Sequence, residues 1–169
     1  YVILDMSPNV GGLNEVMLMS SDYFIVPTTP DFFCWQAVSS LTEYIKIWHG
    51  DLTAFKAGSS PRTVSSLTNS PLFLGTIQQR YRIRKKEPAK SLKWITAIRN
   101  SIDSSLVPCL SKLGCVKDRA QVQGSLDKLG LSLQAYDLAH ISDFNSLIAI
   151  SQNLGRPVFA LTDNDLKNA

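Results

Sequence analysis

The sequence contains few of the residues that build metal centres or disulfide frameworks, with 3 cysteines and 2 histidines among 169 residues. The cysteines, Cys34, Cys109 and Cys115, are odd in number and lack metal-ligand spacing, which is typical of reduced thiols in a cytoplasmic protein. Two histidines argue against a multi-histidine metal site. No apolar run approaches the roughly 20 residues that span a bilayer. We therefore expect a cytoplasmic protein without a membrane segment.

A strong charge of either sign is also missing. The 17 basic and 14 acidic residues give a net charge of +3, which does not by itself indicate nucleic-acid binding. The hydrophobic content of 44% is that of an ordinary globular domain, and the length fits one domain with a sizeable core. Function must therefore be sought in local patterns.

Segments that resemble strands and helices alternate along the chain. We predict strands at residues 1–5, 23–26, 72–77 and 131–138, and helices at residues 13–19, 32–48, 88–110, 118–130 and 143–153. Residues 50–70 are polar and are expected to form a loop. Asp31 is a suitable cap for the second helix, and Pro108 should disturb or end the third. Alternation with continuous apolar strands predicts an α/β fold, a mostly parallel sheet with helices on both faces.

The first five residues, YVILD, are an apolar run that ends in Asp5. We expect residues 1–169 to form one partial domain whose sheet lacks its amino-terminal part. A carboxylate at the end of a buried strand lies where open α/β sheets place their chemistry, although Asp5 alone is equally compatible with a helix cap or a surface position. Pro8, Gly11 and Gly12 then mark a turn that approaches a ligand closely or is merely flexible.

Residues 1–48 resemble the ParA/MinD/Soj group of P-loop ATPases. The resemblance rests on an ordered pattern: an apolar strand, Asp5, Pro8, Leu13-Asn14, Ser21-Asp22, Pro27 and Pro30-Asp31. The turn at Gly155-Arg156-Pro157-Val158 is similar to a late turn of the family. The resemblance implies a P-loop NTPase fold of the ParA type that starts here at the Walker B strand, with ATP and Mg²⁺ as ligands.

The same resemblance assigns catalytic roles near the start of the chain. Asp5 would hold Mg²⁺ and its waters beside the triphosphate. Backbone amides near Gly11 and Gly12 would sense the γ-phosphate or the attacking water. The family often has two prolines after the aspartate, where this sequence has Ser7-Pro8.

Three residues further along the chain are assigned to the nucleotide base. Gln79 stands where the family commonly has an asparagine that reads the adenine edge, and an amide offers both a donor and an acceptor. Main-chain contacts to the base are expected near His140 and Ile141. An exposed loop position for Gln79 and a packed or surface position for His140 remain the simpler alternatives.

The phosphate-cradling motif of the family, Lys-Gly-Gly-x-Gly-Lys-Thr/Ser, does not occur in these 169 residues. We therefore expect this chain on its own neither to hydrolyse ATP nor to bind it tightly. The alternatives are a positioning ATPase like MinD, a non-catalytic binding module of the same fold, and an enzyme that couples ATP to reduction. The spacing of Cys109 and Cys115 is a poor match for the last.

A basic stretch follows the third predicted strand, and its cationic residues are Arg80, Arg82, Arg84, Lys85 and Lys86. It would contact phosphate backbones without sequence preference, or it is a solvated loop. By resemblance, the complete protein would form a homodimer on ATP binding and act with non-specific DNA and a ParB-like partner.

Three aromatic residues, Phe32, Phe33 and Trp35, lie at the predicted start of a helix. They are interpreted either as a partner surface or as part of the core, and core packing is the favoured interpretation.

Overall fold

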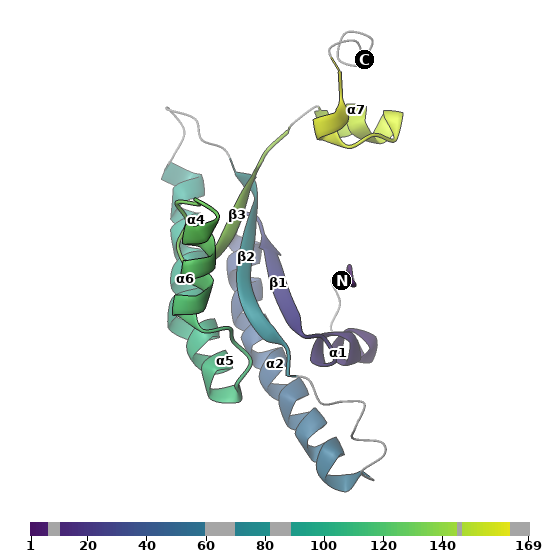
Figure 1. Ribbon diagram of the computed structural model, residues 1–169, viewed down its shortest axis with the longest axis vertical. Helices are drawn as coiled ribbons and strands as arrows, with labels where there is room; N and C mark the ends of the chain where they lie inside the picture. Colours follow the sequence, from purple (N-terminus) through teal and green to yellow (C-terminus); the bar gives the residue numbers. More distant parts are fainter. Residues whose placement is uncertain (7–10, 60–69, 82–88, 145–146, 163–169) are drawn as a thin grey trace.

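The computed structural model describes residues 1–6, 11–59, 70–81, 89–144 and 147–162 (Figure 1). Within them, three parallel strands form one sheet in the order β1 (Tyr23–Thr28), β2 (Leu72–Tyr81), β3 (Tyr136–Ser142). Helices occupy each connection between neighbouring strands, as parallel pairing requires. The predicted α/β class, a parallel sheet flanked by helices, is confirmed.

The helices are α1 (Gly12–Met19), α2 (Phe32–Gly58), α4 (Ala89–Ser101), the π-helix η1 (Ile102–Leu106), α5 (Val107–Leu113), α6 (Arg119–Lys128), α7 (Leu147–Leu154) and the short η2 (Val158–Ala160). The helices α2, α4, η1 and α5 contact one another, and α6 contacts β3. Helix α7 lies beyond the carboxyl end of β3, away from the other helices (Figure 1). Among the described residues, no helix combines the length and the apolar character needed to cross a membrane.

Helix α2 begins as predicted but runs further. The Asp31 carboxylate accepts a hydrogen bond from the Cys34 N–H at 2.8 Å and so caps the helix, and Val38, Ile45 and Trp48 form its buried stripe. The predicted end near residue 48 is wrong, because residues 50–58 continue the helix instead of forming a loop. The alanines, the leucine and the lysine of this segment are good helix formers. Leu52 also packs against the core, and the helix projects past the start of the sheet (Figure 1).

The helix after β2 passes through Pro108 and ends at Leu113. The expected disturbance is the π-helix of residues 102–106, which ends two residues before the proline. The ring and missing N–H of Pro108 are incompatible with regular α hydrogen bonding. The buried residues recur at every fourth position, namely Ile98, Ile102, Leu106 and Leu110. Gly114, with a φ of 70°, ends α5 in the left-handed conformation.

The third strand of the sheet starts later than predicted. Residues 131–135 are not a strand, because the side chain of Gln123 on α6 holds their backbone: its amide donates to the Leu133 carbonyl at 3.1 Å and accepts from the Ala135 N–H at 2.8 Å. Pairing begins at Tyr136, opposite Gly75. The second strand is also longer than predicted and extends to Tyr81.

Residues 1–5 do not form the predicted strand. They have no regular secondary structure, and Tyr1, Val2 and Ile3 are each at least 88% exposed. An extended segment is stabilised by ladder hydrogen bonds to a neighbouring strand, and the sheet of the described residues ends at β1. Figure 1 shows the start of the chain and α1 beside the lower part of β1.

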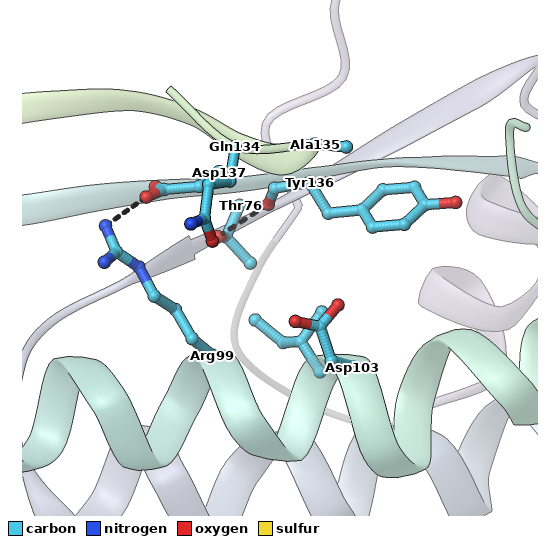
Figure 2. A pocket seen from close by; sticks show the side chains of 8 residues that line it. Thr76, Arg99, Asp103, Gln134, Ala135, Tyr136 and Asp137 are labelled. Atoms are coloured by element: carbon cyan, nitrogen blue, oxygen red, sulfur yellow. Dashed lines mark hydrogen bonds and ion pairs between the residues drawn. The ribbon is translucent and has the colours of Figure 1, made fainter. Parts of the chain in front are cut away.

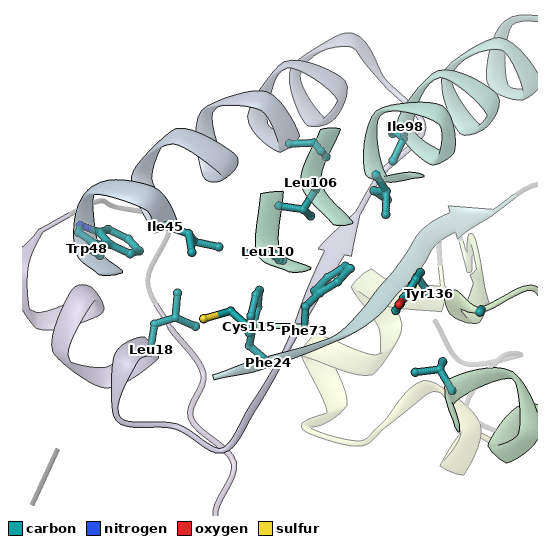
Figure 3. Packing of buried hydrophobic residues seen from close by; sticks show 14 of the residues in the cluster. Leu18, Phe24, Ile45, Trp48, Phe73, Ile98, Leu106, Leu110, Cys115 and Tyr136 are labelled. Atoms are coloured by element: carbon teal, nitrogen blue, oxygen red, sulfur yellow. The ribbon is translucent and has the colours of Figure 1, made fainter. Parts of the chain in front are cut away.

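The hydrophobic core lies between the sheet and the layer of α2, α4, η1 and α5 (Figure 3). Phe24 and Phe73 from neighbouring strands pack at 5.3 Å between ring centroids, and Phe73 stacks on Tyr136 at 5.8 Å. Phe73 also pairs with the segment that follows α5. Its N–H donates to the Cys115 carbonyl, and its carbonyl accepts from the Lys117 N–H. Burial of these rings fixes the three strands against the helices.

Candidate functional site at the carboxyl ends of the strands

One polar residue from each strand lies in a single row near the carboxyl edge of the sheet. Thr28 of β1 is the register partner of Gln78 of β2, and Gln78 is the partner of His140 of β3. Thr28 and Gln78 are each 3% exposed. The carboxyl edge is where open parallel sheets bind ligands, so this row is the first element of a candidate site.

Two members of the row have polar atoms without a partner. The Thr28 Oγ1 and Gln78 Nε2 atoms are buried and form no hydrogen bond with any residue that the structure describes. A buried polar group without a hydrogen bond costs about 1–3 kcal/mol. An ordered water or a polar group of a ligand at this edge would remove that cost.

The third member belongs to a charged cluster that links the sheet to α4. The Asp137 carboxylate forms an ion pair with the Arg99 guanidinium, and its oxygens lie 2.9 and 3.0 Å from the His140 Nε2. The same Nε2 lies 3.2 Å from an Arg99 nitrogen. The Asp137 side chain is 8% exposed, whereas that of Arg99 is 39% exposed. The positive charge of Arg99 and the imidazole of His140 therefore offset the cost of burying the Asp137 carboxylate.

A small pocket opens beside this cluster (Figure 2). Its lining comes from α4 and η1 on one side and from β2 and the start of β3 on the other, and comprises Thr76, Arg99, Ile102, Asp103, Gln134, Ala135, Tyr136 and Asp137. The Thr76 hydroxyl donates to the Tyr136 carbonyl at 3.1 Å. The Arg99 Nε atom is buried and has no partner among the described residues.

The turn after β1 is held by its own side chains. The Thr29 hydroxyl contacts the Asp31 carboxylate, and the Cys34 sulfur lies 3.3 Å from the Thr29 N–H, which donates to it. These contacts fix the first turn of α2 at the carboxyl edge. They also hold the Asp31 carboxylate at the amino-terminal end of α2, where its negative charge is favourable.

The structure separates the predicted catalytic residues from the predicted base-binding residues. Gln79, His140 and Ile141 lie on the last parts of β2 and β3, with Gln79 exposed and Ile141 41% exposed. Asp5 lies in the exposed first segment, while Gly11 precedes α1 and Gly12 begins it, near the other end of β1 (Figure 1). Neither Gly11, with a φ of −73°, nor Gly12 adopts a backbone that requires glycine.

Most of the basic stretch lies outside the residues that the structure describes. Arg80 lies on β2, and Arg82, Arg84, Lys85 and Lys86 lie outside the described residues. Its proposed contact with DNA therefore stays a prediction.

The favoured interpretation of the aromatic residues at the start of α2, core packing, is confirmed for Trp35 and wrong for Phe32 and Phe33. Phe32 is 45% exposed and Phe33 is 79% exposed. Trp35 is half-buried and packs against the core. Phe33 is five residues before Val38, so at 100° per residue it lies about 140° away from the buried stripe of α2 and its ring faces solvent.

Sequence analysis missed four residues of this region: Thr28 and Gln78 in the row near the carboxyl edge, and Arg99 and Asp137 in the charged cluster beside it. The alternation of polar Thr76 and Gln78 with Ile77 was the available signal, because alternate residues of a strand share a face. Their register with Thr28 and His140 depends on two irregularities in the pairing. Register of this kind is not readable from the sequence.

The described residues include no cluster of three or more His, Cys, Asp or Glu side chains that could hold a metal ion. An isolated Asp5 is nevertheless compatible with Mg²⁺ bound mainly through phosphate oxygens and water, which is how this ion is usually held beside nucleotides. The described residues thus fit one protein ligand to Mg²⁺ and do not build a complete site.

Comparison with known families matches residues 1–54 to a family described as an AAA domain. This segment covers α1, β1 and most of α2 and includes Asp5. The match supports a P-loop ATPase-like domain and suggests nucleotide-binding ATPase function. Searches of curated proteins and of solved structures give no match.

Proposed function

We propose that this chain forms part of a ParA-type ATPase, which binds and hydrolyses ATP with Mg²⁺ to drive the segregation of plasmids or chromosomes. The similarity of residues 1–54 to an AAA domain carries the proposal. The ordered pattern from Asp5 to Pro30-Asp31 adds the ParA type. The parallel sheet, with its polar row at the carboxyl edge, is the scaffold that such an activity needs.

The nucleotide base is proposed to lie at the carboxyl ends of β2 and β3. Gln79 and the backbone near His140 and Ile141 are the positions that the family pattern assigns. Gln78 is a further candidate, because its buried Nε2 atom has no partner among the described residues. Asp5 is proposed to hold Mg²⁺ and its waters, and the backbone at Gly11 and Gly12 to respond to the γ-phosphate. These roles require the start of the chain to join the sheet.

The direct test is Mg²⁺-dependent ATP hydrolysis by the protein encoded by the full natural open reading frame that contains residues 1–169. Turnover should fall at least about tenfold in Asp5→Ala, because the carboxylate positions the metal beside the phosphates. Asp51→Ala, which removes an exposed carboxylate from α2, is the matched control and should keep wild-type turnover. Equal hydrolysis by both variants would show that Asp5 does not act in the site. Complete absence of nucleotide binding would contradict the ATPase and favour a non-catalytic binding module.

The segregation role is tested separately with DNA. Non-specific duplex DNA should stimulate hydrolysis, and the double reversal Arg82→Glu/Arg84→Glu should abolish that stimulation while leaving basal turnover unchanged. An equal charge change at exposed Lys112 and Lys128 controls for net charge. Stimulation by anionic lipid vesicles instead of DNA would favour a positioning ATPase.

The proposed homodimer and partner need separate experiments. Sedimentation with and without a non-hydrolysable ATP analogue tests the nucleotide-dependent homodimer, and addition of a ParB-like protein to the hydrolysis assay tests the partner.

A further inference from the structure

Four aromatic rings from two helices form a connected patch at the carboxyl edge of the sheet. Phe32 lies at the centre, with its ring centroid 5.8 Å from Phe33, 5.7 Å from Trp35 and 5.7 Å from Trp94. Trp35 and Trp94 are 6.2 Å apart. The first three residues begin α2 and Trp94 belongs to α4, so the patch joins two helices that are separate in sequence. We call these four residues the aromatic patch.

The aromatic patch is exposed on its Phe33 side. Phe33 is 79% exposed and Phe32 is 45% exposed, whereas Trp35 and Trp94 are half-buried. The two tryptophans therefore anchor the rings to the fold, and the phenylalanines present them to solvent. Exposed aromatic clusters on a rigid support are typical of binding surfaces.

Lys93 is an exposed cation beside the aromatic patch. The Lys93 ammonium lies 5.2 Å from the centroid of the Trp94 ring, in the geometry of a cation–π contact. The Asp31 carboxylate at the start of α2 accepts hydrogen bonds from the Cys34 N–H and the Thr29 hydroxyl and keeps its negative charge. The amino-terminal end of a 27-residue helix adds a partial positive charge. A ligand that suits this surface combines planar apolar groups with negative charge.

We propose that the aromatic patch and Lys93 bind single-stranded nucleic acid by stacking unpaired bases on Phe32 and Phe33. Stacking on aromatic side chains beside cationic groups is the general chemistry of such binding, and it is tolerant of sequence. The bases of a duplex already stack on one another, so an intact duplex cannot offer its base faces to the rings. The patch therefore favours unpaired strands, in contrast to a basic segment that contacts phosphates alone. Neither ATP nor the proposed ATPase activity is needed for this binding.

The test uses the full open reading frame without nucleotide and a fluorescent 20-residue oligothymidylate, with anisotropy and tryptophan fluorescence as readouts. Phe33→Ala should weaken binding about tenfold, because loss of one stacking ring costs that much or more in comparable sites. Phe159→Ala is the matched control, since Phe159 is 92% exposed on η2 and lies outside the aromatic patch. Both variants remove an exposed ring and should fold normally, which circular dichroism checks.

Two further ligands separate stacking from simple charge attraction. A duplex of the same length and a polyglutamate of matched charge should each bind at least fivefold more weakly than the oligothymidylate. Equal binding by wild type and Phe33→Ala would overturn the proposal, as would preferential binding of the duplex. Competition by polyglutamate as effective as that by oligothymidylate would also overturn it, in favour of an acidic protein partner. Because these assays contain no ATP, their failure leaves the proposed ATPase untouched.

Discussion

Gly75 and Tyr136 approach each other so closely that a Cβ atom on Gly75 would lie 2.7 Å from both the Cα atom and the carbonyl oxygen of Tyr136. Gly75 has a φ of 145° and Tyr136 a φ of 71°, so both residues adopt conformations in which a side chain is unusual. The two residues are register partners where β3 first joins β2. The close approach places the Tyr136 ring against Phe73 in the core.

Gly75→Ala should lower the free energy of unfolding by about 2–4 kcal/mol, because the new methyl group meets rigid backbone and the residue must keep a strained φ. Urea denaturation measures the change. Gly124→Ala is the matched control: that glycine lies in α6 and an added Cβ meets nothing within 4 Å. It should gain about 0.5–1 kcal/mol from helix propensity. Equal effects at the two positions would contradict the close approach.

Asp137→Ala should lower the free energy of unfolding by about 1–3 kcal/mol. The substitution removes the carboxylate that pairs with Arg99, so the buried part of the Arg99 side chain loses its charged hydrogen-bond partner. Asp103→Ala breaks an ion pair with Arg119 in which both side chains are about half exposed, and it should cost no more than about 1 kcal/mol. A double-mutant cycle with Arg99→Ala isolates the pair. A coupling energy near zero would show that Asp137 is held by His140 instead.

The burial of Tyr136 predicts that the protein loses stability at alkaline pH. Burial raises the pKa of its hydroxyl, so the folded protein prefers the neutral phenol. The resulting stability is complete below the unfolded pKa of about 10 and declines as the pH rises through the higher folded value. Tyr136→Phe should therefore flatten the decline of stability above about pH 10.

Measurement of both proteins at neutral pH supplies the reference for that comparison. There Tyr136→Phe loses only the hydrogen bond from the hydroxyl to the Lys117 carbonyl, of 2.9 Å, worth about 1 kcal/mol. The stability difference between the two proteins should shrink as the pH rises above about 10. A difference that stays constant with pH would mean that the hydroxyl does not titrate with unfolding.

The three thiols should react in two classes with a disulfide reagent at mildly alkaline pH. Cys115 is fully buried, and burial raises the pKa of its thiol, so the reactive thiolate is both rare and inaccessible. Cys34 and Cys109 are half-buried and should react first. The third equivalent should appear only on denaturation, and Cys115→Ala should lose that equivalent alone. Three equal rates would contradict the packing around Phe73.

Local signals predicted the starts of α2 and α6 well, whereas α7 begins at Leu147 instead of the predicted residue 143. Asp31 caps α2 through the Cys34 N–H, and Asp118 caps α6 through the Gln121 N–H. Both depend on side chains within three residues of the helix, which a sequence displays directly. The end of α2 was mispredicted, because Gly50 and Asp51 make the segment after Trp48 resemble a loop, whereas Leu52 packs against the core as part of the helix.

Non-local contacts account for what the sequence did not reveal. The start of β3 depends on Gln123, which lies twelve residues before the Ala135 N–H that it holds. The polar row of Thr28, Gln78 and His140 depends on pairing across three strands. Neither of these relationships leaves a periodic trace in its own segment.

The π-helix of residues 102–106 also explains the spacing of the buried residues around it. Residues four apart drift by about 40° around an α-helix, so Leu110 would lie roughly 120° from Ile98. A π turn contains an extra residue and rotates the chain back, and both side chains remain in the core. The widened turn amounts to a single-residue insertion that the fold has absorbed. Natural variation in the length of this helix is therefore expected first at this turn, and loss of one residue there should come with a shift of the apolar stripe to regular helical spacing.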